Sequence, residues 1–320
     1  MNILIVGLGN FGKKYIYLLN EFYKSYNIYI LRHSRENSIN EDSFCRNFNI
    51  KKILYSLDDT KTIKLDVVII TNPSTFHVEF ANYFIKNNIS CLIEKPLSDK
   101  YEKSLKLINN NNCCIQIGYL LRYSSLYKIL ENYENYIGKL LLVKVNVGQY
   151  LPDWRENNYR ESVSGNKDKG GGVLLELSHD INYLLGFLDI DSYNIKSSFG
   201  KISNLDIDVE DYCFIIMDIV MKSKEKSVVN INLDMIDKNS NRSCKLVGEN
   251  GSILVDFISK NIHIYNNNLN TINNFSNENL LKLQLDDFFN KVKNKNFNNN
   301  KSINDSQLTM KIIDDIKSLK

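Results

Sequence analysis

Residues 1–12, MNILIVGLGNFG, decide the fold of this chain. A short apolar run, Ile3–Val6, ends at Gly7, and Gly9 and Gly12 follow before a helical pattern begins. This order predicts a buried strand, a tight turn and a helix start, which is the context of a G-x-G-x-x-G dinucleotide fingerprint.

Each glycine of the fingerprint has a physical task. Gly7 makes the turn, Gly9 lets the backbone approach a pyrophosphate, and Gly12 allows the helix to pack closely on the strand. The helix that opens at Asn10 and Phe11 presents unsatisfied N–H groups and a partial positive charge to an anion. We therefore expect these five residues to bind the cofactor.

Length and composition limit the class of protein. With 320 residues the chain can bury two cores of ordinary size, so two domains are expected. Lys and Arg number 40 against 37 Asp and Glu, without a long basic block, which argues against a nucleic-acid partner. The first apolar run is too short for a signal peptide, and no later run could span a bilayer. These features favour a cytoplasmic protein without a membrane partner.

The cysteines and histidines carry no metal-site pattern. The six cysteines form no C-x-x-C pair and have no histidine at zinc spacing, and the four histidines are scattered. We expect the cysteines to be reduced and mostly buried, and no metal to be bound.

The end of the second predicted strand, Asn27–Leu31, bears on the choice of cofactor. An acidic residue at this point accepts the ribose hydroxyls of NAD, whereas a basic one accommodates the 2′-phosphate of NADP. Arg32, Ser34 and Arg35 follow the strand, and no carboxylate precedes Glu36. The residues therefore favour NADP(H), with NAD(H) as the alternative and an ordinary charged loop as the bland interpretation.

Further apolar runs predict the other strands of a parallel sheet. They are Lys52–Tyr55, Leu65–Ile70, Ser90–Ile93 and Cys113–Tyr119. The run ending at Ile70 leads into Thr71-Asn72-Pro73-Ser74, and open α/β sheets bind ligands at this end of their strands.

The fifth strand leads directly into Glu94-Lys95-Pro96. Proline fixes the backbone, so Lys95 is a held cation at the carboxyl end of a central strand. Beside an oxidised nicotinamide it could donate a proton to a substrate oxygen or accept one from it. On these residues alone, a surface lysine in a turn is the simpler interpretation.

Three motifs in this order and spacing resemble the Gfo/Idh/MocA family of NAD(P)-dependent sugar oxidoreductases. They are GLGNFG at 7–12, DVVIITNPSTFH at 66–77 and EKPL at 94–97. The resemblance implies that Lys95 is the catalytic lysine and contacts the substrate. Along the cofactor it places Thr71, Asn72, Pro73, His77, Glu94 and Lys95. It continues to Arg122, which matches a family arginine and is assigned to the substrate.

The pattern changes in the second half, where strands alternate with polar turns instead of helices. We expect an N-terminal Rossmann domain with a doubly wound parallel sheet over 1–120. An α+β domain over 121–320, with a large, mostly antiparallel open sheet and closing helices at 279–320, would bind the substrate and mediate oligomerisation. The family resemblance implies pairing through the open face of this sheet, as a homodimer or homotetramer.

One helix, predicted at Val173–Leu188 after three glycines, carries Glu176, His179 and Asp180 on one face. A solvated face is the simpler interpretation of such a stripe. The family resemblance implies an acid and, four residues later, a histidine that deprotonate the sugar hydroxyl together with the lysine. Here Glu176 takes the place of the acid, Asp180 takes that of the histidine, and His179 comes one residue early. We assign Lys95, His179 and Glu176 to catalysis. Glu176, His179 and Asp180 are assigned to substrate binding. His179 is favoured over Asp180 for proton transfer, because the ordinary pKa of histidine suits acid–base chemistry at neutral pH.

The loop before this helix combines stacking surfaces with anion-binding groups. Trp154 and Arg155 are similar to cofactor-covering residues in parts of the family, and Tyr159 and Arg160 suit substrate phosphates. A flexible loop with one packed tryptophan is the simpler alternative. The run from YLPDWR to GGGVLLELSH is also similar to members associated with bacterial surface-sugar biosynthesis.

The sequence thus predicts an enzyme that moves a hydride between NADP(H) or NAD(H) and a hydroxyl or ketone carbon of a sugar or nucleotide sugar, in bacterial surface-glycan biosynthesis. The alternative from another class is a non-catalytic NAD(P)-binding sensor or regulatory protein on the same fold. The displaced histidine supports this alternative, and the intact Glu94-Lys95-Pro96 argues against it.

Overall fold

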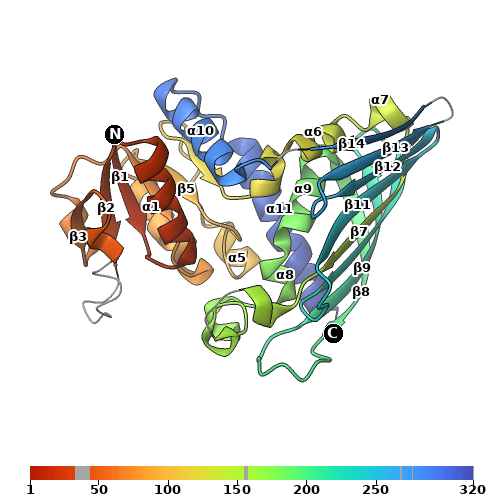
Figure 1. The fold of residues 1–320 in the computed structure, drawn as a ribbon, viewed down its shortest axis with the longest axis horizontal. Coiled ribbons are helices and arrows are strands. Elements are labelled where there is room, and N and C mark those ends of the chain that lie inside the picture. The colour runs from red at the N-terminus through yellow and green to blue at the C-terminus, as the bar shows by residue number, and fades with distance from the viewer. Residues whose placement is uncertain (33–43, 155–157, 267–268, 276, 320) are drawn as a thin grey trace. The chain divides into compact units, whose positions relative to one another are not determined.

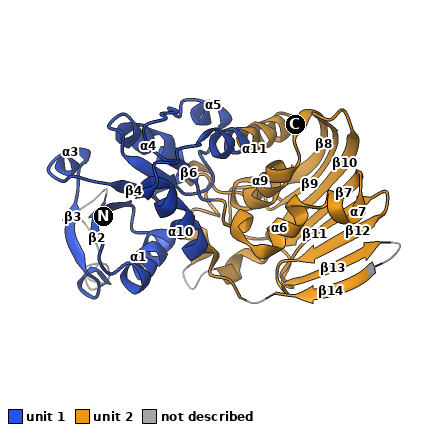
Figure 2. Cartoon of the chain, turned by 90° about the horizontal axis from the view of Figure 1, so that it is seen from above, with its two compact units in different colours: residues 1–118, 281–307 blue, residues 119–280, 308–320 orange. Residues whose placement is uncertain are grey.

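The structure is a computed structural model that describes residues 1–32, 44–154, 158–266, 269–275 and 277–319 (Figure 1). The chain divides into two compact units, which Figure 2 shows in different colours. Unit 1 comprises residues 1–118 and 281–307, and unit 2 comprises residues 119–280 and 308–320.

Unit 1 is built on a six-stranded parallel sheet of order β3-β2-β1-β4-β5-β6. Its strands are β1 (Asn2–Val6), β2 (Asn27–Leu31), β3 (Ile50–Leu54), β4 (Val67–Ile70), β5 (Ser90–Ile93) and β6 (Ile115–Ile117). The four residues of β4 are all buried, as the apolar run predicts for a strand covered on both faces. The strand order reverses between β1 and β4, and ligands of such sheets bind where this reversal occurs.

Helices complete unit 1. They are α1 (Asn10–Phe22), α3 (Leu57–Thr60), the 3₁₀ turn η1 (Ser74–Phe76), α4 (His77–Ile85), α5 (Tyr101–Ser104) and α10 (Leu280–Lys293). The core cluster of this unit joins Ile3 and Ile5 of β1 to Tyr15 of α1 and to Phe288 and Phe289 of α10.

The place of α10 differs from the sequence prediction, which put residues 279–320 wholly in the second domain. Leu285, Phe288 and Phe289 of α10 are buried in the core of unit 1. Asn299 donates its side-chain amide to the carbonyl of Cys113 and accepts the backbone N–H of Ile115 at 2.8 Å. The boundary between the units therefore falls within α11 (Asn300–Ser318), at Gln307.

Unit 2 contains an eight-stranded sheet of order β14-β13-β12-β11-β7-β10-β9-β8, in which only β7 and β10 pair in parallel. Its strands are β7 (Leu140–Gly148), β8 (Ile190–Gly200), β9 (Tyr212–Met221), β10 (Lys226–Asp234), β11 (Asn241–Gly248), β12 (Gly251–Asp256), β13 (Asn261–Asn266) and β14 (Leu269–Asn274). The predicted fold class, a Rossmann sheet followed by an α+β domain with a mostly antiparallel sheet, is confirmed.

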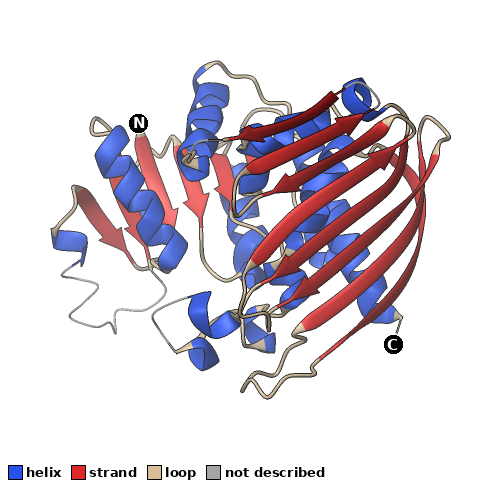
Figure 3. Cartoon of the chain, turned by 45° about the vertical axis from the view of Figure 1, so that its right-hand side comes forward, coloured by secondary structure: helices blue, strands red, loops and turns tan. Residues whose placement is uncertain are grey.

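The strands β9 and β10 bury alternate residues. In β9, Ile215 and Met217 are buried, whereas Phe214 and Ile216 are about half exposed. One face therefore carries the core and the other is open, and Figure 3 shows helices behind only one face.

The helices of unit 2 are α6 (Ser125–Glu131), α7 (Glu134–Ile137), α8 (Val173–Glu176) and α9 (Ser178–Phe187), with the end of α11. Short 3₁₀ turns are η2 (Leu120–Tyr123), η3 (Leu151–Trp154), η4 (Tyr159–Glu161) and η5 (Lys167–Lys169). The single helix predicted at Val173–Leu188 is in fact two, because Leu177 leaves helical geometry at φ −96° and ψ 18° and caps both.

Candidate functional site

The turn between β1 and α1 needs two of its glycines for steric reasons. Gly7 has φ +93°, and a Cβ there would lie 2.9 Å from the backbone nitrogen of Asn72. A Cβ on Gly12 would lie 2.3 Å from the carbonyl oxygen of Gly7. Any larger residue would therefore strain the turn or push α1 away from β1.

Gly9 differs, because nothing lies within 4 Å of the position that its Cβ would take. It is the N-cap residue of α1, and no side chain caps this helix end. The open space over Gly9 thus adjoins the N–H groups of Asn10 and Phe11 at a positive helix terminus. This arrangement fits a dinucleotide pyrophosphate.

Thr71 closes this turn from the end of β4. Its hydroxyl lies 3.0 Å from the carbonyl oxygens of both Val6 and Gly7. The backbone N–H of Thr71 also donates to Val6 at 2.9 Å. The structure therefore gives Thr71 a part in shaping the glycine turn.

His77 joins the turns that follow β4 and β5. Its Nε2 lies 2.7 Å from the carbonyl oxygen of Asn72, and its Nδ1 lies 2.9 Å from that of Pro96. Burial lowers the pKa of His77, while the contacts with the two carbonyls oppose this. A neutral ring has one N–H and donates to one of these carbonyls. Pro73, between these residues, is exposed.

In the Glu94-Lys95-Pro96 turn, the carboxylate of Glu94 is buried and the side chain of Lys95 is partly exposed. The Lys95–Pro96 peptide bond is cis. The side chain of Glu94 is only 5% exposed, and its Oε2 accepts the backbone N–H of Lys95 at 3.2 Å. Burial raises the pKa of Glu94, and a hydrogen bond from Tyr15 counteracts this. Lys95 itself is partly exposed.

The residues predicted to select NADP are only partly described. Arg32 follows β2 and donates its backbone N–H to Leu54 at 2.9 Å, and its side chain is 5% exposed. Ser34 and Arg35 lie outside the described residues.

In unit 2, the structure divides the predicted polar face of α8 and α9 into two parts. Glu176 and His179 are partly exposed. Asp180 is fully buried and lies 3.2 Å from Arg242 of β11. Tyr183, one turn further on, is buried as well. Glu176 and His179 are thus accessible for chemistry, whereas Asp180 is part of a buried ion pair.

Two residues that the sequence did not single out contact Glu176 and His179. Ser164 donates its hydroxyl to Glu176 at 2.9 Å, from the loop that precedes the helix. The ring of Tyr119 lies edge-on to that of His179, with centroids 5.6 Å apart. Gly171 lets this loop approach, since a Cβ there would lie 2.3 Å from the carbonyl oxygen of Val163.

The remaining substrate candidates of unit 2 already have protein contacts. Arg122 donates to the carbonyl oxygen of Asn182 in α9. Arg160 lies 3.1 Å from Asp206, and its guanidinium stacks on Tyr159 with 4.7 Å to the ring centroid. The indole nitrogen of Trp154 is buried, and Arg155 lies outside the described residues.

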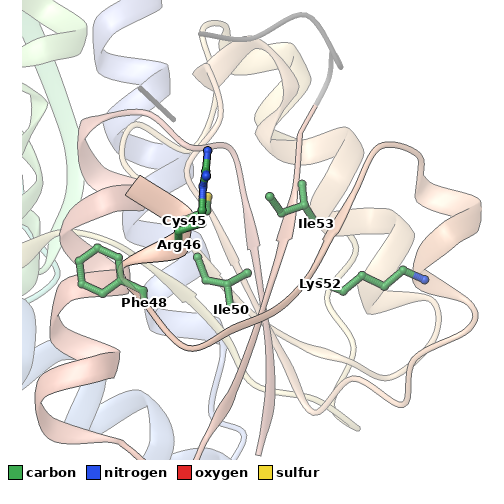
Figure 4. A pocket seen from close by; sticks show the side chains of 6 residues that line it. All are labelled: Cys45, Arg46, Phe48, Ile50, Lys52 and Ile53. Atoms are coloured by element: carbon green, nitrogen blue, oxygen red, sulfur yellow. The ribbon is translucent and has the colours of Figure 1, made fainter. Parts of the chain in front are cut away.

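A surface pocket of about 530 Å³ lies in unit 1 (Figure 4). It is lined by residues of β3 and of the segment before it, namely Cys45, Arg46, Phe48, Ile50, Lys52 and Ile53. None of the predicted site residues that the structure describes lines it.

Within the part of the chain that the structure describes, no helix has both the length and the apolar character needed to cross a membrane. No group of three or more His, Cys, Asp or Glu side chains suits a metal ion among the same residues. The cysteines at positions 45, 91, 113, 114, 213 and 244 are all free and buried, as predicted.

Residues 1–119 match the profile of an oxidoreductase family with an NAD-binding Rossmann fold, Gfo/Idh/MocA. Over this segment, the chain is similar to the Gfo/Idh/MocA family. The predicted resemblance and the prediction of an oxidoreductase are thereby confirmed. No functionally curated protein matches the sequence.

Solved structures of similar fold extend over both units. The UDP-N-acetylglucosamine 3-dehydrogenase GnnA from Acidithiobacillus ferrooxidans has a TM-score of 0.78 at 14% identity, covering 99% of this chain and 97% of that one. A levoglucosan dehydrogenase in complex with NADH has a TM-score of 0.80 at 16% identity, covering 99% and 96%. The WlbA dehydrogenase from Bordetella pertussis, in complex with NADH and UDP-GlcNAcA, has a TM-score of 0.78 at 15% identity, covering 99% and 95%. At these identities the likeness concerns the fold.

The two glycines Gly9 and Gly12 should respond differently to substitution by alanine. Gly12→Ala should lower the free energy of unfolding by about 2 kcal/mol, because its Cβ meets the carbonyl of Gly7. Gly9→Ala should melt like the wild type but bind NADH roughly tenfold more weakly, which is about 1.4 kcal/mol. Thermal melts and NADH fluorescence titrations measure both effects. Unchanged NADH affinity in Gly9→Ala would show that this turn does not hold the pyrophosphate.

Alanine substitutions at Asp180 and at His179 should also differ in their effect on the free energy of unfolding. Asp180→Ala removes the buried carboxylate that pairs with Arg242, whose side chain is 15% exposed, and should lower the free energy of unfolding by about 3 kcal/mol. His179→Ala, at a partly exposed position, should change it by less than about 1 kcal/mol. Urea denaturation of both variants checks this, and a wild-type midpoint for Asp180→Ala would rule out a structural ion pair.

Proposed function

We propose that this protein is an NAD(P)-dependent dehydrogenase or reductase that acts on a hydroxyl or ketone carbon of a sugar or nucleotide sugar. The observation that carries the proposal is the turn after β5, where a buried Glu94 and Pro96 flank the partly exposed Lys95 in a unit with an NAD-binding profile. A lysine held in this way is suited to proton transfer at a substrate oxygen.

The residues of the glycine turn would hold the cofactor. The open space over Gly9 and the uncapped terminus of α1 would receive the pyrophosphate, and Thr71, Asn72 and His77 line the neighbouring turn. When bound, the nicotinamide ring supplies or accepts the hydride. The chain itself must then bind the sugar, orient its hydroxyl and exchange the hydroxyl proton.

For the proton we propose Lys95 together with His179, oriented by Glu176. The partial exposure of His179 and Glu176 supports this choice, as does the burial of Asp180 against Arg242. Ser164 would fix the carboxylate of Glu176. An ordinary histidine titrates near neutral pH and can both accept and return a proton.

Nucleotide sugars in bacterial surface-glycan biosynthesis are the substrates we propose more narrowly. GnnA is a UDP-N-acetylglucosamine 3-dehydrogenase, and the WlbA structure contains UDP-GlcNAcA. The similarity of the loop sequence before α8 to surface-sugar members supports the same class. We also propose a homo-oligomer formed through the open face of the eight-stranded sheet, where Phe214, Ile216 and Val228 are exposed.

Lys95→Ala should reduce turnover by a factor of about 10²–10⁴, the contribution of one general acid–base group. Its NADH dissociation constant should stay within about threefold of the wild type, because the pyrophosphate contacts remain. The assay follows nicotinamide absorbance over a panel of free sugars and UDP-sugars with NAD⁺ and NADP⁺.

Lys51→Ala, at an exposed lysine of β3, is the matched control and should turn over normally. Full activity of Lys95→Ala would reject its catalytic role. Cofactor binding without turnover on any sugar would instead favour the non-catalytic sensor.

NADPH should bind at least tenfold more tightly than NADH, which is about 1.4 kcal/mol. The reason is that Arg32 follows β2 where an NAD-specific site has a carboxylate. Paired fluorescence titrations at one ionic strength give the ratio. Tighter binding of NADH would assign the protein to NAD(H), the cofactor named in the levoglucosan dehydrogenase and WlbA complexes.

A further inference from the structure

The carboxylate of Glu94, the residue before Lys95, is buried. It is 5% exposed, and a Cβ on Gly118, just after β6, would lie 3.2 Å from both of its oxygens. Oε2 accepts the backbone N–H of Lys95. The position of this carboxylate therefore affects the backbone that carries Lys95.

Two buried polar residues from distant parts of the sequence meet at the other oxygen. The hydroxyl of Tyr15, in α1, lies 2.6 Å from Oε1 of Glu94 and 2.9 Å from the side-chain oxygen Oε1 of Gln284, in α10. Both Tyr15 and Gln284 have no exposed surface. Such groups are costly to bury unless they are hydrogen-bonded, so their meeting needs an explanation.

Counting hydrogens gives this contact a direction. A tyrosine hydroxyl has one hydrogen, and an ionised carboxylate can only accept. Two acceptors, Oε1 of Glu94 and Oε1 of Gln284, thus lie within reach of the one hydrogen of Tyr15, and the shorter contact is the one with Glu94. The Nε2 of Gln284 has no hydrogen-bond partner among the described residues. Rotating this amide by 180° makes Nε2 the donor to the Tyr15 oxygen and leaves the hydrogen of Tyr15 to Glu94, and we infer this orientation because it satisfies all three groups. The result is a relay from Gln284 through Tyr15 to Glu94.

The relay opposes the effect of burial on the charge of Glu94. Burial raises the pKa of Glu94, whereas the Tyr15 hydrogen bond and the nearby charges of Lys95 and Lys14 lower it. Gly118, just after β6, faces Glu94, and Gln284 of α10 contacts Tyr15; neither residue carries a titratable group. Tyr15 is thus the neutral donor that helps to keep the carboxylate ionised and in one orientation.

We propose that Tyr15 and Gln284 are positioning residues, which fix Lys95 through the carboxylate of Glu94. The proposal rests on the proposed catalytic role of Lys95. Neither residue contacts the reacting atoms, and both act through the turn after β5. In this way a helix near the end of the chain supports a turn in its first third.

The same two helices offer a matched control. Tyr23, which caps α1, donates its hydroxyl to Asp286 of α10 at 2.7 Å. Like the contact of Tyr15 with Glu94, this is a tyrosine–carboxylate hydrogen bond. It joins the end of α1 to α10 and does not involve Glu94. Removing either hydroxyl therefore loosens the same helix pair, and only the change at Tyr15 acts on Lys95.

The test is the rate at which acetic anhydride acetylates Lys95, measured by peptide mass spectrometry with Lys51 as internal reference. In Tyr15→Phe, Glu94 loses the hydrogen bond from residue 15, so its carboxylate can rotate or take up a proton. The backbone of Lys95 is then held less firmly by Glu94, and less negative charge lies near the Lys95 amine. Lys95 should react at least threefold faster than in the wild type. In Tyr23→Phe its rate should not change. Gln284→Met should accelerate it about twofold and serves in place of Tyr15→Phe if that variant does not fold.

Wild-type labelling of Lys95 in the folded Tyr15 or Gln284 variant would overturn the proposal, as would equal acceleration in Tyr23→Phe. Where a sugar is turned over, Tyr15→Phe should lower kcat about tenfold and leave the NADH dissociation constant unchanged. The labelling needs no substrate. Selective acceleration of Lys95 without turnover on any sugar would therefore support the positioning while refuting the proposed enzyme.

Discussion

The contact between Gly12 and the carbonyl of Gly7 is the constraint on which unit 1 depends. It lets α1 approach β1 more closely than any residue with a Cβ would allow. Tyr15 lies one helical turn further along the same side of α1. The close approach therefore brings its hydroxyl to Glu94, and the glycine turn and the Glu94-Lys95-Pro96 turn become parts of one arrangement.

Local sequence predicted most of this arrangement, because local chemistry determines it. The bounds of β2 and β5 agree with the predicted runs, and the glycines lie where a positive φ or a close approach requires them. The role of Tyr15 was missed, since its spacing in α1 reads only as core. A tyrosine in an otherwise apolar stripe does need a partner for its hydroxyl, and this signal could have pointed to a buried acceptor.

Other features depend on partners far away in the sequence, which periodicity does not reveal. Asp180 looks like a site residue on a helical wheel, and its partner Arg242 follows only in β11. The return of α10 to unit 1 rests on Leu285, Phe288 and Phe289, whose spacing shows an apolar face without showing what covers it. The strand β14, rich in asparagine, lacks the apolar alternation that predicted other strands.

The split of unit 1 between residues 1–118 and 281–307 has a consequence for synthesis of the chain. When a ribosome has released the first 118 residues, the segment that buries Ile3, Ile5 and Tyr15 against Phe288 has not yet been made. This apolar surface therefore stays uncovered, or is held by a chaperone, until residues 281–307 have also emerged. The turn that carries Lys95 thus gains the support of Gln284 only after α10 has been synthesised.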